Sequence, residues 1–192
     1  TTMTKMLNPR VGTLVFIILA AAATRLLPHP PNLTAMTALA LFGGSYFSDR
    51  RLAFMVPLVA LLLSDVALGL YWSWSFMAIQ PHMWVQYLTF LLIVGMGMTW
   101  LRDKRGPLRI GLVTLAASCA FYVITNFFEW VFQPWYPKTA AALVLSYVAA
   151  IPFFRNALIG DLVYTALLFG GFHLLERRYA VLRRPQVPAH SL

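Results

Sequence analysis

Residues 52–70 read LAFMVPLVALLLSDVALGL, a run in which Asp65 is the one ionisable side chain. An α-helix needs about 20 consecutive apolar residues to cross the hydrocarbon core of a bilayer. This run therefore predicts a transmembrane helix, and the stretches on either side of it are just as apolar.

The composition of the whole chain leads to the same class. Hydrophobic residues make up 60% of the 192 residues and charged residues 11%, whereas soluble domains carry about 25% charged residues. A soluble globular domain, a disordered chain and a coiled coil are therefore excluded. The net charge is +9, which in a soluble protein would suggest a nucleic-acid partner. Here the basic residues lie between apolar runs, where such residues set membrane topology, so we expect no nucleic-acid partner. The single cysteine, Cys119, excludes an internal disulfide and a cysteine-cluster metal site.

Seven apolar runs divide the chain, at residues 11–27, 34–47, 52–70, 82–101, 110–132, 139–154 and 157–175. We predict one all-α membrane domain with six transmembrane helices, in which residues 139–154 form a re-entrant or interfacial segment. The run 34–47 is short for a span, so we expect it to borrow flanking residues or to lie where the bilayer is thin.

The basic residues predict the orientation of the six helices. With the N-terminus in the cytoplasm, 12 of the 15 basic residues fall on the cytoplasmic side: Lys5, Arg10, Arg50, Arg51, Arg102, Lys104, Arg105, Arg109, Arg177, Arg178, Arg183 and Arg184. A full crossing by residues 139–154 would put the last four arginines outside, against the positive-inside rule. We therefore predict that both termini are cytoplasmic.

Tryptophan residues concentrate on the opposite side. On this topology the non-cytoplasmic side holds Trp72, Trp74, Trp84, Trp130 and Trp135, and only Trp100 lies near the cytoplasm. An ordinary interfacial belt occupies both faces. The asymmetry favours an outward-facing aromatic surface.

Ionisable side chains inside the apolar runs are costly and are functional candidates. They are Arg25, Asp65, Glu129, Arg155 and Asp161. One interpretation is that they pair with one another and hold helices together, Arg155 with Asp161 or Asp65, and Arg25 with Glu129. Ligand binding is compatible with such pairing.

Three outer segments combine stiff loops, aromatic rings and a few polar groups, as a small-molecule pocket requires. We predict that Pro152 ends a helix and turns Arg155 inward, where its guanidinium can hold a carboxylate or an amide. The predicted ligand-binding residues are His29, Asn32, Asp65, Trp72, Trp74, Gln80, His82, Tyr87, Trp135, Tyr136, Arg155 and Asn156.

Several motifs do not occur in the sequence. It contains no GxxxxGK[ST] loop, no GxSxG, no HExxH and no evident internal repeat. We therefore expect a protein that is not an enzyme, does not hydrolyse ATP itself and is not an inverted-repeat carrier. The Gly43-Gly44 pair and Gly95-x-Gly97 predict close helix packing.

Several motifs together resemble a known family. They are RLLPHPPN (25–32), ALALFGG (38–44), LSDVALG (63–69), YPKT (136–139), AAIPFFRN (149–156), Gly160-Asp161 and LFGG (168–171). They are similar to the substrate-binding S-components of energy-coupling factor (ECF) vitamin transporters, and most similar to the BtuM family of small cobalamin transporters. The resemblance implies a six-helix protein of the bacterial inner membrane that binds a vitamin from outside. It implies a partner ECF module or transport without one.

The resemblance also implies cobalamin as the transported ligand, while we expect no cofactor of the protein's own. BtuM proteins bind cobalt through a cysteine in the loop after the third helix, and residues 71–81 contain none. Imidazole is a better ligand for a transition metal than the hydroxyl groups of Ser73 and Ser75. His82 is therefore the candidate cobalt ligand, with His29 as the alternative. Otherwise the cobalt has no protein ligand, or the ligand is not cobalamin.

Three alternatives remain open from the sequence. The first is an S-component-like transporter of another vitamin or of a cofactor precursor. The second is a membrane enzyme acting on lipid, with Asp65, Glu129 and His29 as acid/base groups. The third is a structural subunit whose polar residues only pair helices. In every case membrane lipid surrounds the protein.

Overall fold

The computed structural model describes residues 8–72 and 81–183, and every regular element in these ranges is helical. The elements are α2 (Pro9–Ala23), η1 (Thr24–Leu26), α3 (Met36–Tyr46), α4 (Arg50–Trp72), α5 (Pro81–Met96), η3 (Gly97–Leu101), α6 (Pro107–Phe132), α7 (Ala140–Arg178) and η4 (Ala180–Leu182). The predicted all-α class is confirmed for this part of the chain.

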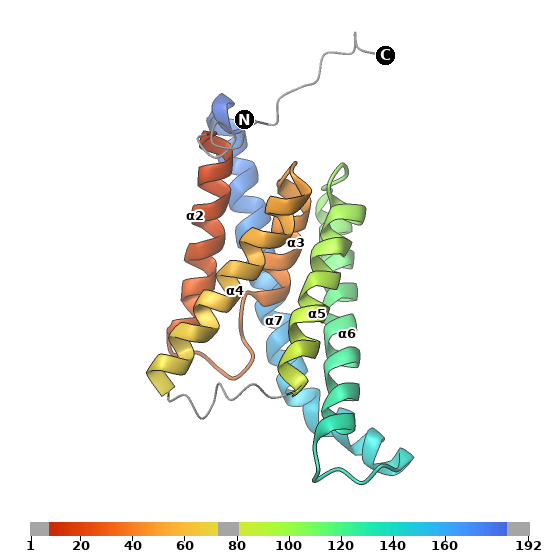
Figure 1. The fold of residues 1–192 in the computed structure, drawn as a ribbon. Coiled ribbons are helices and arrows are strands. Elements are labelled where there is room, and N and C mark those ends of the chain that lie inside the picture. Colours follow the sequence, from red (N-terminus) through yellow and green to blue (C-terminus); the bar gives the residue numbers. More distant parts are fainter. Residues whose placement is uncertain (1–7, 73–80, 184–192) are drawn as a thin grey trace.

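Six helices, α2 to α7, alternate in direction along one bundle (Figure 1). The Arg10 guanidinium at the start of α2 donates a hydrogen bond to the carbonyl oxygen of Leu182 in η4. The first and last described elements therefore meet at one end, which we call the basic end because Arg51, Arg105 and Arg178 also lie there. The opposite end, with residues 27–35 and 133–139, is called the loop end.

Five helical segments of the described chain are long and apolar enough to cross a membrane. They are Pro9–Leu26, Arg50–Tyr71, Met83–Leu101, Pro107–Phe132 and Ala140–Arg178. Their outer faces carry large exposed apolar side chains, such as Phe16 at 71%, Leu88 at 66% and Leu167 at 63% exposure. Such a surface is consistent with a multi-pass membrane protein, because lipid can cover it where water cannot.

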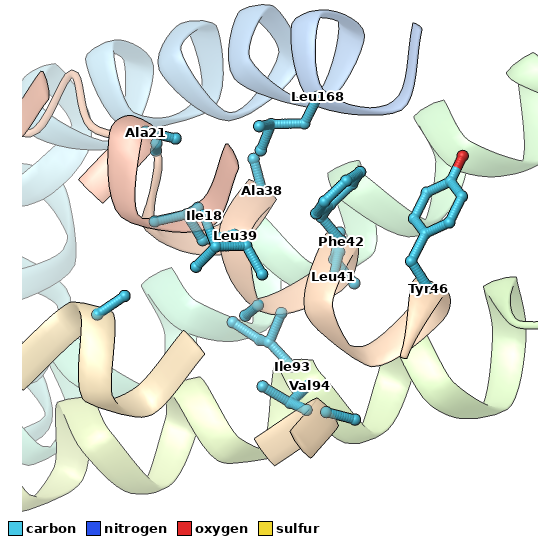
Figure 2. Close-up of a cluster of buried hydrophobic side chains, with 14 of the residues drawn as sticks. Ile18, Ala21, Ala38, Leu39, Leu41, Phe42, Tyr46, Ile93, Val94 and Leu168 are labelled. Atoms are coloured by element: carbon cyan, nitrogen blue, oxygen red, sulfur yellow. The ribbon is translucent and has the colours of Figure 1, made fainter. Parts of the chain in front are cut away.

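Helix α3 is the short sixth helix and lies at the centre of the bundle, in contact with the other five. All its residues from Thr37 to Tyr46 are buried. Figure 2 shows Leu39 of α3 beside Ile18 of α2, and Ala38 of α3 beside Leu168 of α7. A helix that is apolar all round belongs in the interior. The run 34–47 therefore forms a short helix enclosed by the others, and α3 does not borrow flanking residues.

Three glycines allow this close packing. An added Cβ would lie 2.2 Å from the Pro57 ring at Gly43, 2.2 Å from the Val94 carbonyl oxygen at Gly44, and 2.5 Å from the Leu41 carbonyl oxygen at Gly97. Gly97 opens a π-helical turn at the end of α5. The predicted packing role is confirmed for these three. A Cβ added at Gly95 would have no atom within 4 Å, so Gly95 has no such role between the described helices.

Helix α7 differs from the prediction. Residues 140–178 form one continuous helix that contains Pro152, so the expected helix end at that proline is wrong, and so is a separate re-entrant hairpin. A proline inside a helix removes one hydrogen bond and bends the helix without necessarily ending it. The first part of α7 turns away from the bundle at the loop end (Figure 1). An interfacial position of this part stays a prediction.

Candidate functional site at the loop end

A polar cluster joins three elements near the loop end. The Arg25 guanidinium of η1 forms an ion pair with Asp65 of α4, with 2.7 Å between Nη1 and Oδ1. The Tyr87 hydroxyl of α5 donates to the other carboxylate oxygen, Oδ2, at 2.6 Å. The side chains of Arg25 and Asp65 are 11% and 15% exposed. We call these three residues the outer cluster.

Ser64 extends the outer cluster toward the helix backbone. Its hydroxyl accepts a hydrogen bond from Arg25 Nη1 and donates to the Leu61 carbonyl oxygen at 2.8 Å. Among the described residues, Arg25 Nε is buried without a hydrogen-bond partner, as are Arg10 Nη2 and Arg102 Nε at the basic end. An unmet buried N–H group of this kind needs an explanation, such as a water molecule or a ligand.

The observed ion pair corrects two predicted pairings. Arg25 pairs with Asp65 rather than with Glu129, and Asp65 is therefore not the partner of Arg155. Charge spacing along the chain could not reveal this, because the pairing depends on the contact between η1 and α4, which are far apart in sequence. The wider prediction that ionisable groups near the outer ends of the spans pair with one another is confirmed for Arg25 and Asp65.

The loop at residues 27–35 lies against α7. Asn156 Nδ2 donates to the Pro31 carbonyl oxygen at 3.1 Å. A Cβ added at Gly160 would lie 3.1 Å from both the N and O atoms of Thr34, so glycine permits this close approach. Asn32 has a φ of 63°, a left-handed conformation that asparagine tolerates better than most residues. Two predicted site residues, Asn32 and Asn156, therefore shape the loop.

The His29 ring is exposed and contacts its own loop. Its Nδ1 lies 2.9 Å from the Pro30 carbonyl oxygen, and its Nε2 lies 3.3 Å from the Arg25 carbonyl oxygen. Both nitrogens face acceptors, so ligation of a metal would require the ring to turn. In the part of the chain that the structure describes, no group of three or more histidine, cysteine or acidic residues could hold a metal ion.

Trp135 and Tyr136 lie in the loop between α6 and α7, on another side of the bundle from residues 27–35 (Figure 1). Trp135 is 65% exposed. This loop is closed by Trp130 Nε1, which donates to the Pro137 carbonyl oxygen at 3.0 Å, and by Lys138 Nζ, which donates to the Gln133 carbonyl oxygen at 3.1 Å. The structure therefore keeps this aromatic group separate from the outer cluster.

Arg155 has an exposed side chain on the continuous helix α7. The predicted inward turn of its guanidinium is wrong, because it required α7 to end at Pro152. Trp74 and Gln80 fall outside the described residues, as do the side chains of Trp72 and His82. An apolar groove of about 430 Å³ on the flank of α5 and α6 is lined by Trp84, Val85, Leu88, Thr89, Ile124, Phe128 and Phe132, and contains none of the predicted site residues.

Asp161 has a role that the sequence did not indicate. It is 4% exposed, accepts a hydrogen bond from Ser118 Oγ of α6 at 2.7 Å, and is also hydrogen-bonded by the hydroxyl and the backbone N–H of Thr37. Thr37 lies in the first turn of α3, which has no side-chain cap of its own. Asp161 therefore caps the buried N-terminus of α3 from α7, a favourable place for a carboxylate.

Comparison with known proteins gives a family and no function. Residues 5–187 match a family described as a family of unknown function, DUF6580, so the chain belongs to that family. No curated protein matches the chain. No solved structure matches it.

Proposed function

We propose that this member of DUF6580 is a membrane-embedded uptake protein that binds a vitamin-sized ligand at the loop end. The observation that carries the proposal is the outer cluster, an ion pair at the end of membrane-spanning helices with one buried N–H group of Arg25 unmet. Ionisable groups in such positions are costly and mark ligand pathways in many membrane proteins.

The setting of the outer cluster supports a ligand site. Arg25 lies in η1, which ends one residue later where the loop 27–35 begins. The prolines of this loop restrict its backbone, and its contacts with Asn156 and Gly160 hold it against α7. A stiff loop beside a charged and aromatic cluster offers hydrogen bonds and flat contact area to one small molecule. The proposed pocket opens to the non-cytoplasmic side.

Cobalamin is the ligand we propose to test first. This choice rests on the sequence resemblance to ECF S-components of the BtuM family. The broad corrin ring, fringed with amides, suits aromatic faces and side-chain amides. Another vitamin or a cofactor precursor would use the same surface, and the transport step would use a shared ECF module or none.

The binding experiment uses the full-length protein purified in detergent. We expect it to retain cobalamin through gel filtration, with a dissociation constant that Asp65→Asn raises about tenfold, because the change removes the charge that orients Arg25. Arg50→Gln, an exposed change at the basic end, is the matched control and should bind as the parent does. Retention of another vitamin instead would change the ligand and keep the site.

Stability measured on the same variants separates binding from a structural role. The stability of the Asp65→Asn variant is measured without ligand and compared with its affinity. If the loss of stability accounts for the whole loss of affinity, the outer cluster only holds the helices together and the proposal fails. The cobalt ligand is tested by the visible spectrum of bound cobalamin. We expect His82→Ala to change it, and an unchanged spectrum would move the test to His29→Ala.

A further inference from the structure

A hollow of about 330 Å³ opens at the basic end, beside the last turns of α7. His173, Glu176, Arg177 and Arg183 line it. It lies at the opposite end of the bundle from the outer cluster (Figure 1). A ligand bound in this hollow would therefore not contact the proposed vitamin site.

Arg183 is fixed in position at the edge of this hollow. Its Nε donates to the Glu176 carbonyl oxygen at 3.0 Å, and its Nη2 donates to the Arg177 carbonyl oxygen at 3.2 Å. These carbonyl groups belong to the last turn of α7, whose acceptors have no partner within the helix. A guanidinium has five N–H donors, so this anchoring leaves donors for a ligand.

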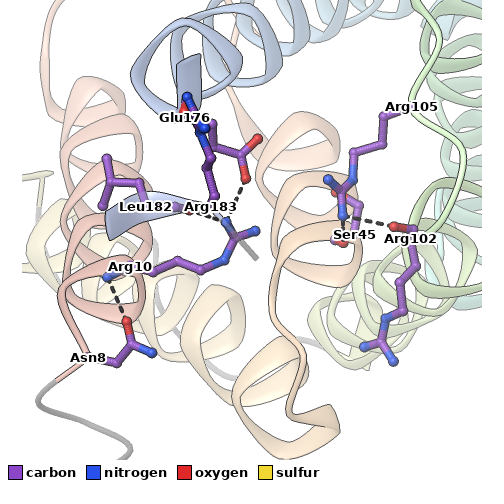
Figure 3. Close-up of polar contacts among 8 residues, drawn as sticks. All are labelled: Asn8, Arg10, Ser45, Arg102, Arg105, Glu176, Leu182 and Arg183. Atoms are coloured by element: carbon purple, nitrogen blue, oxygen red, sulfur yellow. Dashed lines mark hydrogen bonds and ion pairs between the residues drawn. The ribbon is translucent and has the colours of Figure 1, made fainter. Parts of the chain in front are cut away.

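The carboxylate in the hollow is neutralised from the protein interior. Arg10 Nη1 lies 2.5 Å from Glu176 Oε1, and the Arg10 side chain is 5% exposed. Figure 3 shows Arg10 reaching Glu176 and Leu182 from α2. With Glu176 paired, the positive charges of Arg177 and Arg183 dominate the hollow. Its ligand should therefore be an anion.

The helices that form the hollow also carry exposed apolar side chains. Leu174 is 64% exposed on α7, and Val181 is 60% exposed on η4. These apolar residues belong to the last turns of α7 and to η4, and Arg183 directly follows η4. The headgroups of a bilayer lie at the end of a helix that crosses it. An occupant with an acidic head and a hydrocarbon tail matches both features.

We propose that this hollow binds the phosphate group of an anionic phospholipid, with Arg177 and Arg183 as its donors and the Arg10–Glu176 pair as its neutral base. The proposal requires the protein to lie in a membrane and does not depend on vitamin uptake. It assigns a specific lipid site to a region whose other arginines attract acidic lipids only diffusely.

Native mass spectrometry of the full-length protein, titrated with phosphatidylglycerol or phosphatidylcholine in detergent, tests the proposal. We expect one phosphatidylglycerol to bind preferentially. The Arg177→Gln/Arg183→Gln variant should bind it about thirtyfold more weakly, since each lost arginine weakens attraction to an anionic lipid about fivefold. Arg50→Gln/Arg51→Gln removes the same charge from exposed positions at the same end and should change affinity less than about twofold.

Two results would overturn the lipid site. Equal weakening in both double variants would show diffuse attraction to the basic end. Displacement of the lipid by inorganic phosphate at similar concentration would show a site for a free anion. Because Arg183 also caps α7, Arg177→Gln alone is measured too, and it should weaken phosphatidylglycerol binding while the thermal unfolding temperature stays unchanged.

Discussion

Two buried or half-buried carboxylates, in helices long and apolar enough to cross a membrane, are stabilised in different ways. Asp65 has a cationic partner, Arg25, and a phenol donor, Tyr87. Asp161 is hydrogen-bonded by the hydroxyl of Ser118 and by two groups of Thr37 at the N-terminus of α3. The same residue type therefore belongs to a candidate ligand site in one place and to the framework of the bundle in the other.

The ion pair should contribute more stability than the phenol contact. Asp65→Ala leaves the Arg25 charge without its partner and should lower the free energy of unfolding by about 3 kcal/mol. Tyr87→Phe removes one hydrogen bond and should cost about 1 kcal/mol. Unfolding in mixed micelles with increasing SDS measures both. If the two losses are equal, the Arg25–Asp65 ion pair adds nothing beyond the phenol hydrogen bond.

The cap on α3 predicts a graded series at position 161. Asp161→Ala removes the acceptor of the Thr37 donors, whereas the Ser118 hydroxyl can still donate to the carbonyl oxygen of Thr114 at 3.0 Å. We expect the change to lower the free energy of unfolding by about 2 kcal/mol. Asp161→Asn keeps one acceptor oxygen and should lose less. Arg155→Ala, an exposed change on the same helix, should cost under about 0.5 kcal/mol. The same SDS titration measures all three, and an Asn variant as unstable as the Ala variant would contradict the capping role.

At the scale of elements, length separates α3 from α7. Eleven residues of α3 span about 16 Å, roughly half the bilayer core, whereas 39 residues of α7 span about 58 Å, roughly twice it. The short helix is enclosed by its neighbours, and the long one extends beyond them at the loop end (Figure 1). Packing, more than hydropathy, therefore determines the place of each helix.

Glycine packing around α3 gives the prediction at this scale. Gly44→Ala would bring a methyl group to 2.2 Å from the Val94 carbonyl oxygen, which is backbone and cannot move aside cheaply. We expect a loss of more than about 2 kcal/mol in the free energy of unfolding. Gly170→Ala on α7 has no neighbour within 4 Å and should be neutral or slightly stabilising. Similar losses for both variants would contradict close packing at Gly44.

At the scale of the whole molecule, the two ends differ in charge. The described part of the basic end carries Arg50, Arg51, Arg102, Lys104, Arg105, Arg109, Arg177, Arg178 and Arg183 beside the Arg10–Glu176 pair. The loop end carries the outer cluster and the aromatic loop of α6 and α7. The contact between Arg10 and Leu182 brings the two described chain ends together at the basic end.

Orientation in the membrane follows from this charge difference. We expect reporter fusions at the N-terminus and the C-terminus to respond as cytoplasmic, because basic residues stay on that side during insertion. Cysteine labelling at an added site in the 27–35 loop should be accessible from outside. An external C-terminus would contradict the predicted topology and the position of the ligand site.

The sequence predicted the helical class and five of the six helices at close to their observed bounds. The prediction that Asp65, Tyr87, Asn32 and Asn156 bind a ligand stays a prediction. The predictions from sequence were wrong where a residue's role depends on neighbours in space that are distant in the sequence. Arg25 pairs across helices with Asp65, which chain spacing does not reveal. Pro152 stays inside α7, where the helix bends instead of ending. Asp161 could be identified as a cap only once α7 was seen beside the start of α3.

The contact between Asp161 of α7 and Thr37 of α3 can form only late in the synthesis of the chain. Helix α3 is the second of the six to leave the ribosome, yet its N-terminal cap, Asp161, is translated 124 residues after Thr37. Until α7 packs beside α3, the backbone N–H and the hydroxyl of Thr37 lack this acceptor. A nascent chain stopped before residue 161 should therefore hold α3 in a state that proteases and chaperones can recognise, so that quality control can distinguish finished copies from unfinished ones.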